Sequence, residues 1–375
     1  MRFVVAFLVL SGLAALAAVI YGNVPLDYGY YLDQWRLVLA GDNPWRGNNA
    51  YGPLHNAFAP LITLDPLLPK VAVAGLLLAA NAALVLRLLR IRHDDAWIET
   101  YAIALAANPL FTISAFWLGL NDALVAALVI AAVLARHSDR LVLAGVLLGL
   151  ATLDKYYPAL LIPFFALDAR RFAPRLVVSA LVTIAAGLAI ATLVWDSQWM
   201  EALAFGVSRD ATILSIFHPI AVFGRDHGLS DLADALVRFN GPLVVIVWLA
   251  AIAVAWLRRE RWLVSATWGL FAVLLAYKVG NQQFFVTWLG LVACLPLLTD
   301  PSAERLARVS LPYAIFLGLF ELGYVFLQPQ YYQGQWHWII DWIGVPSFAL
   351  GVILLVQYFR SHAAATGDTA RQNET

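Results

Sequence analysis

Long uninterrupted runs of apolar residues recur along the whole chain, and they limit what it can fold into. Runs such as 71–89, 98–118 and 174–195 are long enough to cross a membrane. In lipid, only α-helices and closed barrels satisfy all of their backbone hydrogen bonds. The runs lack the period-two alternation of a barrel strand. Charged residues make up 13% of the chain, about half of the roughly 25% found in soluble domains. The sequence therefore predicts an all-α, polytopic membrane helical bundle.

The runs predict about 12 transmembrane or half-transmembrane helices in a single domain over residues 1–359. The first run is interpreted as a retained helix, because its apolar part exceeds the roughly 7–15 residues of a signal peptide core. The tail at 360–375 is small and polar and is predicted to be a disordered cytoplasmic tail. The predicted passes are 2–22, 71–89, 98–118, 122–136, 141–153, 158–168, 174–195, 242–257, 262–278, 283–299, 309–328 and 344–359.

Positive charge predicts the orientation of these passes. Cytoplasmic loops of membrane proteins carry an excess of Lys and Arg. With both termini in the cytoplasm, the cytoplasmic turns are rich in arginine, and the long loops 23–70 and 196–241 lie outside. This arrangement requires residues 141–168 to cross and return as two short helices around Lys155. The arginines on the predicted cytoplasmic side are Arg87, Arg90, Arg92, Arg136, Arg140, Arg170, Arg171, Arg175, Arg258, Arg259, Arg261, Arg305, Arg308 and Arg360.

Several classes of protein are excluded by what the sequence lacks. The net charge is zero, so no electrostatic argument favours binding to nucleic acid. Cys294 is the only cysteine, so no disulfide can form within the chain, and its place inside an apolar run favours a packing role. No nucleotide-binding or metal-binding motif is present. The sequence therefore predicts no metal site and requires no cofactor, although a divalent metal stays compatible with it.

The first long loop concentrates acids and aromatic residues in a chain that is otherwise mostly apolar. Asp27, Asp33 and Asp42 all lie within residues 24–54. Asp27 has two compatible interpretations: it caps a helix that begins near Tyr28, or it is a fixed carboxylate that accepts a proton as general base. Asp33 follows six residues later and is not on the same helix face. A paired-carboxylate site is therefore the weaker hypothesis.

A lysine interrupts the apolar stretch L-A-G-V-L-L-G-L-A-T-L-D-K-Y-Y-P-A-L-L-I-P at 143–163. A charged side chain at membrane depth costs several kcal/mol unless it faces a cavity or is paired. Lys155 has two interpretations: it binds a phosphate as a compact charge, or it forms a salt bridge with Asp154 or Asp122.

The second long loop, 196–241, offers Arg209 and His218 as further candidates. Arg209 follows a helix-forming segment that could lay it against the membrane face, where it could contact a phosphate. A histidine in an outer loop is more often simply solvated or hydrogen-bonded. The aromatic residues of 331–338 are interpreted first as a belt at the membrane interface.

Several of these motifs resemble those of a known enzyme class. The loop segments L-D-Y-G-Y-Y-L-D, A-G-D-N-P-W and Y-G-P-L resemble the first extracytoplasmic loop of GT-C glycosyltransferases. L-N-D-A-L at 120–124, the lysine stretch at 143–163 and, more loosely, 280–296 match the same class. The resemblance is to the bacterial polyprenol-phosphate-mannose-dependent mannosyltransferases and more distantly to the catalytic subunit of GPI mannosyltransferase I. Trp45 stands where those families usually have tyrosine.

The resemblance implies a membrane enzyme of the bacterial plasma membrane. Such an enzyme moves a hexose, by default mannose, from a polyprenyl-phosphate donor to a lipid-linked or glycan acceptor, outside the cytoplasm and with inversion. No predicted cytoplasmic loop is long enough for a soluble nucleotide-binding domain, which also favours a lipid-carried donor. Asp27 aligns with the catalytic acid of the family. The residues expected to bind the donor or substrate are Lys155, Tyr156, Arg209, Asp33, Asn121, Asp122, Tyr51, His218 and Gln283.

Two alternative functions remain open from the sequence. A transporter or flippase of lipid-linked sugars would also have about 12 helices, but transporters often show internal repeats, and the motifs of the first half do not recur in the second. A lipid-linked oligosaccharide polymerase or ligase would be an enzyme of the same kind with a different catalytic loop.

Overall fold

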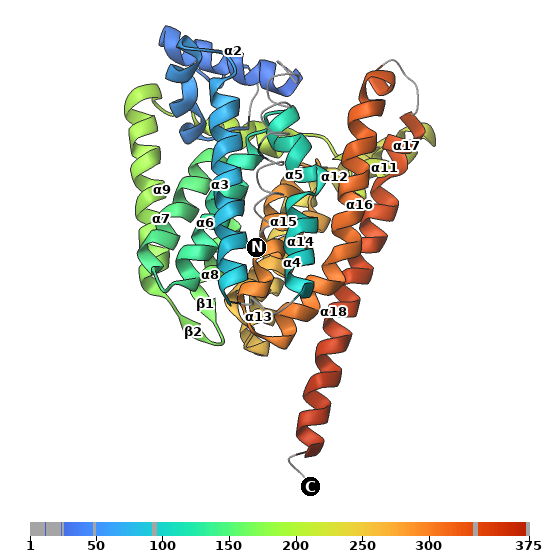
Figure 1. The fold of residues 1–375 in the computed structure, drawn as a ribbon. Helices are drawn as coiled ribbons and strands as arrows, with labels where there is room; N and C mark the ends of the chain where they lie inside the picture. The colour runs from blue at the N-terminus through green and yellow to red at the C-terminus, as the bar shows by residue number, and fades with distance from the viewer. Residues whose placement is uncertain are drawn as a thin grey trace.

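The computed structural model describes residues 12, 24, 26–47, 50–91, 96–332 and 337–372 (Figure 1). Within this part of the chain the fold is helical, as the sequence predicts. The predicted first pass at 2–22 lies outside the described residues, apart from Gly12.

The first half of the chain runs from the acidic loop to the lysine break and back. Its helices are α2 (Leu26–Ala40), η1 (Pro53–Thr63), α3 (Leu68–Ile91), α4 (Ala96–Ala106), α5 (Pro109–Thr112), η2 (Ile113–Trp117), α6 (Asp122–His137), α7 (Leu141–Asp154), η3 (Tyr157–Leu161) and α8 (Ile162–Ala166). The strands β1 (Leu167–Asp168) and β2 (Arg171–Phe172) then form a short antiparallel pair.

The second half continues the bundle. Its helices are α9 (Pro174–Trp195), α10 (Met200–Ser208), α11 (Phe217–Asp226), α12 (Ser230–Arg238), α13 (Asn240–Arg258), α14 (Trp262–Ala276), α15 (Phe284–Cys294), η4 (Leu295–Leu297), α16 (Pro301–Tyr332), α17 (His337–Trp342) and α18 (Gly344–Gln372). The strands β3 (Thr212–Ile213) and β4 (Val279–Gly280) pair in parallel and join the second long loop to the connection after α14.

Five described helices are long and apolar enough to cross a membrane: α3, α9, α13, the first 25 residues of α16, and α17 with α18 as far as Arg360. Shorter apolar helices, among them α7, α14 and α15, complete the bundle. Each predicted pass after the first coincides with described helices: 98–118 comprises α4, α5 and η2, 122–136 is α6, and 158–168 comprises η3 and α8. The prediction of an all-α polytopic membrane bundle is therefore confirmed.

Arginine-bearing turns gather at one end of the bundle. Arg136 Nε donates to the carbonyl of Phe165 at 3.2 Å, and its guanidinium lies 5.7 Å from the ring centre of Trp262. Arg261 pairs with Asp168 at 3.0 Å. These contacts join the ends of α6 and α8, the β1–β2 hairpin and the start of α14 at the lower end of Figure 1.

The three lysines of the chain lie toward the other end and make internal contacts. Lys70 Nζ donates to the carbonyl of Trp117 at 2.7 Å, and Lys278 Nζ donates to that of Val207 at 3.0 Å. Lys155 lies at the break between α7 and η3. Residues 141–166 therefore cross to this break and return, as the charge pattern requires. Figure 1 shows α2 at this upper end.

Two segments differ from the sequence prediction. Residues 196–241, predicted as an amphipathic loop, fold largely into α10, α11 and α12. Helix α18 continues to Gln372, whereas a disordered tail is expected from residue 360. The alanines that follow Arg360 have the highest helix propensity of any residue, so they extend a helix that has already nucleated in the bundle.

Helices α7 and α9 pack closely because small residues of α7 face α9. A Cβ added to Gly145 would lie 2.0 Å from Ser179 Oγ and 2.3 Å from the Leu176 carbonyl oxygen. Small residues of this kind let helix backbones approach one another in membranes, where apolar burial does not drive association. This contact fixes the direction of α7 and therefore the position of the lysine break at its end.

We expect Gly145→Ala to lower the thermal stability of the purified protein, because overpacking of a close contact costs about 1–3 kcal/mol. The matched control is Gly75→Ala on α3, where an added Cβ meets nothing within 4 Å. Alanine there should leave the stability unchanged or slightly raised. Equal melting temperatures for the two variants in one detergent would contradict the close α7–α9 contact.

Candidate active site

Helix α2 packs its aromatic face against η1. Tyr28, Tyr31 and Trp35 are buried at 1%, 1% and 2% exposure, which no isolated loop could achieve. Trp35 Nε1 donates to the carbonyl of His55 at 2.8 Å. The loop between the first two predicted passes is therefore a packed unit with its own small core, and it holds the opposite face of α2 in place.

Asp27 lies in the first turn of α2, which begins at Leu26 rather than near Tyr28. A carboxylate at this position is stabilised by the helix dipole. Its side chain is accessible, yet the surrounding protein removes enough water to raise its pKa above the ordinary 3.8. The positive charges of Lys155 and Arg209 oppose this increase, so both cations lie within electrostatic reach of the carboxylate.

Asp33 points in a different direction from Asp27. Six residues turn an α-helix by about 600°, so the two side chains are about 120° apart around α2. Asp33 accepts from Arg36 at 2.7 Å, and both side chains are exposed, at 69% and 63%. The structure therefore does not bring Asp33 to the lysine break.

The Y-G-P-L segment docks directly on the end of α7. Gly52 N donates to the carbonyl of Asp154 at 2.8 Å. A Cβ on Gly52 would lie 2.1 Å from the Leu153 carbonyl oxygen, so only glycine allows this approach. The contact joins loop 23–70 to the break and sets Tyr51 beside Lys155.

Lys155 follows the last residue of α7 in extended backbone and turns its side chain inward. Its Nζ lies 2.6 Å from Asp122 Oδ2, and the two side chains are 6% and 0% exposed. The ring centres of Phe284 and Tyr51 lie 4.6 and 5.5 Å from Nζ. Of the two salt bridges that the sequence allows, the structure shows the one with Asp122. An ammonium has three donors, so hydrogen-bonding capacity remains for a ligand.

Two buried polar groups beside this pair, Asp154 and His55, are not among the residues that the sequence predicts for the site. Asp154 is fully buried, and neither of its carboxylate oxygens makes a hydrogen bond of normal geometry, although the side chain of Asn121 lies beside it. His55 is also buried; burial lowers its pKa to about 3, with a smaller contribution from Lys155, while Asn121 opposes the shift. Asn121 therefore lies between an acid and a neutral imidazole. The only signal in the sequence is that these residues adjoin the matched motifs.

The tyrosines around the break act as neutral hydrogen-bonding groups. Tyr51 Oη donates to Tyr31 Oη at 3.0 Å, and burial raises the pKa of both phenols. Tyr156, one of the residues predicted to bind the donor or substrate, is half-buried and donates to the carbonyl of Trp199 at 3.3 Å. Tyr157, which was not predicted, lies against α15, with its Oη 2.6 Å from Thr287 Oγ1.

Arg209 reaches the same region from the second long loop. It follows α10 directly, and its charge acts on both Asp27 and Tyr51. Its position depends on the β3–β4 pairing and on Lys278, whose Nζ donates to the carbonyl of Val207 at 3.0 Å. Loop 196–241 therefore brings a second cation to the carboxylate of α2.

Two further predicted site residues, Gln283 and His218, differ in whether they adjoin Lys155. Gln283 is 7% exposed and directly precedes Phe284, the ring beside Lys155. His218 instead bridges α11 and α17: its Nε2 lies 3.2 Å from Asp341 Oδ1, and its Nδ1 lies 3.1 Å from the Ala211 carbonyl oxygen. The described contacts of His218 include neither Asp27 nor Lys155.

The charged groups of the site are suited to binding an anion next to a proton acceptor. Within the described residues, no three His, Cys, Asp or Glu side chains are placed to hold a metal ion. Lys155 and Arg209 can attract a phosphate, and Asp27 can accept a proton at the same place.

We expect Lys155→Met to destabilise the protein strongly, because removing one partner of a buried ion pair leaves the other charge uncompensated, at about 3–5 kcal/mol. The double variant Lys155→Met with Asp122→Leu should recover most of the loss, since apolar replacement of a whole pair is often neutral. Thermal unfolding in detergent measures both. A double variant no more stable than Lys155→Met alone would contradict an energetic coupling between Lys155 and Asp122.

The family model described as glycosyltransferase family 87 matches residues 51–277, which include Asp122, Lys155 and Arg209 but not Asp27. Comparison with curated proteins finds no match. Because the family match covers more than half of the 375 residues, the chain belongs to glycosyltransferase family 87 and is a membrane glycosyltransferase.

Proposed function

We propose that this glycosyltransferase moves a hexose from a polyprenyl-phosphate donor to a hydroxyl of a lipid-linked or glycan acceptor. The observation that carries the proposal is the accessible carboxylate of Asp27 within electrostatic reach of Lys155 and Arg209. A proton acceptor beside two cations is the arrangement that transfer from a sugar phosphate needs. Mannose is the sugar favoured by the resemblance of the loop motifs.

A lipid-carried donor fits the surroundings of the site. Helix α9 is mostly uncovered by the rest of the protein, and near its upper end Leu193 is 86% exposed and Val194 60% exposed. Trp195, the last residue of α9, packs edge-on against Trp45 of loop 23–70, with 5.5 Å between the two ring centres. A polyprenyl chain in the bilayer could follow this surface, which would place its phosphate near Lys155.

The reaction is a single displacement. Asp27 accepts the proton of the acceptor hydroxyl while that oxygen attacks the anomeric carbon. The bond between the anomeric carbon and the phosphate oxygen breaks, and the lipid phosphate takes the electron pair. Attack from the face opposite the leaving group inverts the anomeric configuration, and one carboxylate suffices, unlike in glycoside hydrolysis. Asp33, which faces away, has no role in this scheme.

The leaving phosphate departs ionised, so it needs cations and no general acid. Lys155 keeps hydrogen-bonding capacity beyond its bond to Asp122, and Arg209 presents a fork of donors suited to phosphate. Two cations can stabilise the developing charge without a metal ion. We therefore propose transfer that does not depend on a divalent metal.

The site end of the bundle is proposed to face away from the cytoplasm. The arginine turns gather at the opposite end, where the positive-inside tendency places the cytoplasm. The described connections at that end are short, and they hold only the β1–β2 pair and the single turn η4. We propose a bacterial plasma membrane, with both termini cytoplasmic. Membership of a glycosyltransferase family favours transfer over the alternative of a transporter.

We expect Asp27→Asn to lower the transfer rate by about 10²- to 10⁴-fold, the contribution of a positioned general base. Donor binding should persist, because Lys155 and Arg209 are unchanged. The measurement is sugar transfer from a panel of polyprenyl-phosphate sugars by purified protein, with bound donor detected by mass.

Asp33→Asn is the matched control, since it makes the same chemical change on the same helix at an exposed position. It should retain full activity. Full activity in Asp27→Asn would rule out the proposed base, and loss in both variants would indicate a general effect on α2.

We expect kcat/KM to rise with pH as Asp27 loses its proton, with a midpoint above the ordinary value of 3.8. This rise is the acidic limb of the pH profile. Arg209 lowers the pKa of Asp27, so Arg209→Gln should move the midpoint of the acidic limb to higher pH. Arg36→Gln removes an exposed arginine paired with Asp33 and should leave the limb unchanged. An unmoved limb in Arg209→Gln would contradict the electrostatic coupling.

A further inference from the structure

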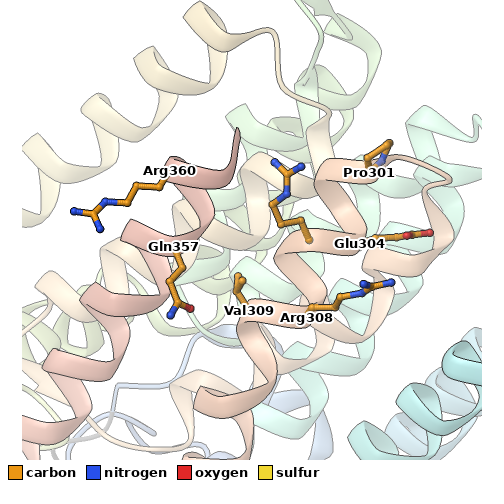
Figure 2. Close-up of a pocket in the computed structure, with 7 residues that line it drawn as sticks. Pro301, Glu304, Arg308, Val309, Gln357 and Arg360 are labelled. Atoms are coloured by element: carbon orange, nitrogen blue, oxygen red, sulfur yellow. The ribbon is translucent and has the colours of Figure 1, made fainter. Parts of the chain in front are cut away.

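Charged groups outside the candidate active site occur at both ends of the bundle. At the arginine-rich end, a hollow of about 750 Å³ lies between α16 and α18. Figure 2 shows Arg308 on one helix and Arg360 on the other, directed away from each other, so the two do not form a single binding group. At the opposite end, an ion pair of His218 and Asp341 joins α11 to α17. This second pair lies close in sequence to Arg209 of the candidate active site.

The two ring nitrogens of His218 face oxygen atoms that can only accept hydrogen bonds. Nε2 lies 3.2 Å from Asp341 Oδ1, and Nδ1 lies 3.1 Å from the carbonyl oxygen of Ala211. A neutral imidazole has one N–H and one lone pair, so it can donate to only one of these oxygens. A protonated imidazole donates to both. The two contacts together therefore fit the cationic form of His218, paired with the carboxylate of Asp341.

Few other charges lie beside this pair in the described part of the chain. The two side chains are 14% and 18% exposed. Of the elements packed against α11, β3 carries no charge, and α18 carries none before Arg360. His337 at the start of α17 is exposed, and so is Asp210, which acts on Lys278. The remaining titratable or charged residues of α11, its end and α12 are exposed as well: Arg225, Asp226, His227, Asp231, Asp234 and Arg238. Asp341 is therefore the acid that directly contacts the ring.

Ala211 connects His218 to Arg209, because it follows Arg209 by two residues in a segment without helix or strand structure. Among the described hydrogen bonds, the carbonyl of Ala211 accepts the one from His218 and no other. The Ala211 side chain is buried in a small apolar cluster with residues of α11 and α12. The backbone that carries Arg209 is thus held by His218 on one side. On the other side it is held by Lys278, whose Nζ donates to the carbonyl of Val207.

The other partner of the ring, Asp341, also has a fixed position. Helix α17 ends at Trp342, and α18 begins two residues later at Gly344. A Cβ on Gly344 would lie 2.3 Å from the carbonyl oxygen of Ser215, so α18 starts in close contact with the backbone that follows β3. The carboxylate of Asp341 is therefore a fixed anchor, and a charged imidazole ties the Ala211 segment to it.

We propose that protonated His218 is a positioning residue for Arg209. By donating to both Asp341 and Ala211, it holds residues 209–211 in the conformation that directs the Arg209 guanidinium to the phosphate of the donor. Loss of the proton removes one of the two donors and loosens this segment. Histidine changes charge between about pH 5 and 8, so donor affinity falls as the pH rises through this range. This role rests on the proposed function in assigning Arg209 to the donor phosphate.

Hydrogen exchange of residues 209–216 in the purified full chain, without substrate, tests the positioning itself. After correction for the intrinsic effect of pH on exchange, protection in the wild type should fall between about pH 5.5 and 8.5. His218→Gln cannot become charged, so its protection should stay low throughout. Asp341→Asn removes the negative charge that favours the imidazolium, so the fall should occur at lower pH.

Binding of polyprenyl-phosphate mannose, measured without an acceptor, tests the consequence for the site. The wild type should bind this donor about tenfold more weakly at about pH 8 than at about pH 6, the size expected for one hydrogen bond to a charged group. The phosphate diester of the donor does not titrate in this range, so the change belongs to the protein. His218→Gln should bind weakly at both pH values.

A double variant shows whether His218 acts through Arg209. Arg209→Gln with His218→Gln should bind the donor no more weakly than Arg209→Gln alone, because the second change removes nothing further. The matched control is His227→Gln, an exposed histidine at the end of α11 whose Nδ1 lies 3.0 Å from the carbonyl oxygen of Phe223 in the same helix. It should keep the pH dependence of the wild type.

The two measurements separate the possible failures. Donor binding that falls with pH in His218→Gln as it does in the wild type, or additive losses in the double variant, would overturn the role of His218 and leave the transfer proposal intact. An exchange profile of His218→Gln that follows the wild type would overturn the positioning. Absence of donor binding at every pH would overturn the proposed donor and with it the phosphate role of Arg209, whereas the exchange measurement would still decide whether His218 holds the segment.

Discussion

The buried ion pair between Lys155 and Asp122 is the interaction on which the candidate site depends. Both side chains are nearly inaccessible, and their atoms lie 2.6 Å apart. A lone charge at this depth would cost several kcal/mol, so neither residue is tolerable without the other. The pair joins the start of α6 to the end of α7, and the Y-G-P-L segment docks on that end through Gly52. Through this contact the pair sets the distance between the lysine and the loop that carries Asp27.

The two ends of the bundle use cations differently. At the site end, lysines bind carbonyls or a carboxylate within the protein, as Lys70 and Lys278 show. A lysine presents a compact charge on a flexible stem and can reach one buried acceptor. At the other end arginines predominate, and their broad, always charged groups suit an interface rich in phosphate. This division is compatible with one end that binds substrate and another that anchors the protein in its membrane.

Much of the fold could be predicted because it depends on local pattern. Apolar runs predict the passes, since a helix in lipid must satisfy its own backbone. The break at Lys155 followed from a charge and a proline inside an apolar stretch, and α7 ends one residue earlier. Asp27 was predicted as a helix cap or a general base, and the family resemblance singled it out among the acids of its loop. In the structure it lies in the first turn of α2, within electrostatic reach of Lys155 and Arg209. Its role in catalysis stays a prediction.

The sequence by itself determined the class of fold, the helical segments and the residues able to carry charge into the membrane. Only the tertiary structure decided the partners: Lys155 pairs with Asp122 rather than with the adjacent Asp154, and His218 binds Asp341 of α17. It also paired Asp33 with Arg36 at the surface of α2. The reason is physical: helix formation depends on neighbours in sequence, whereas the pairing of buried charges depends on which helices pack together, and close contacts such as that of Gly145 with α9 set that packing.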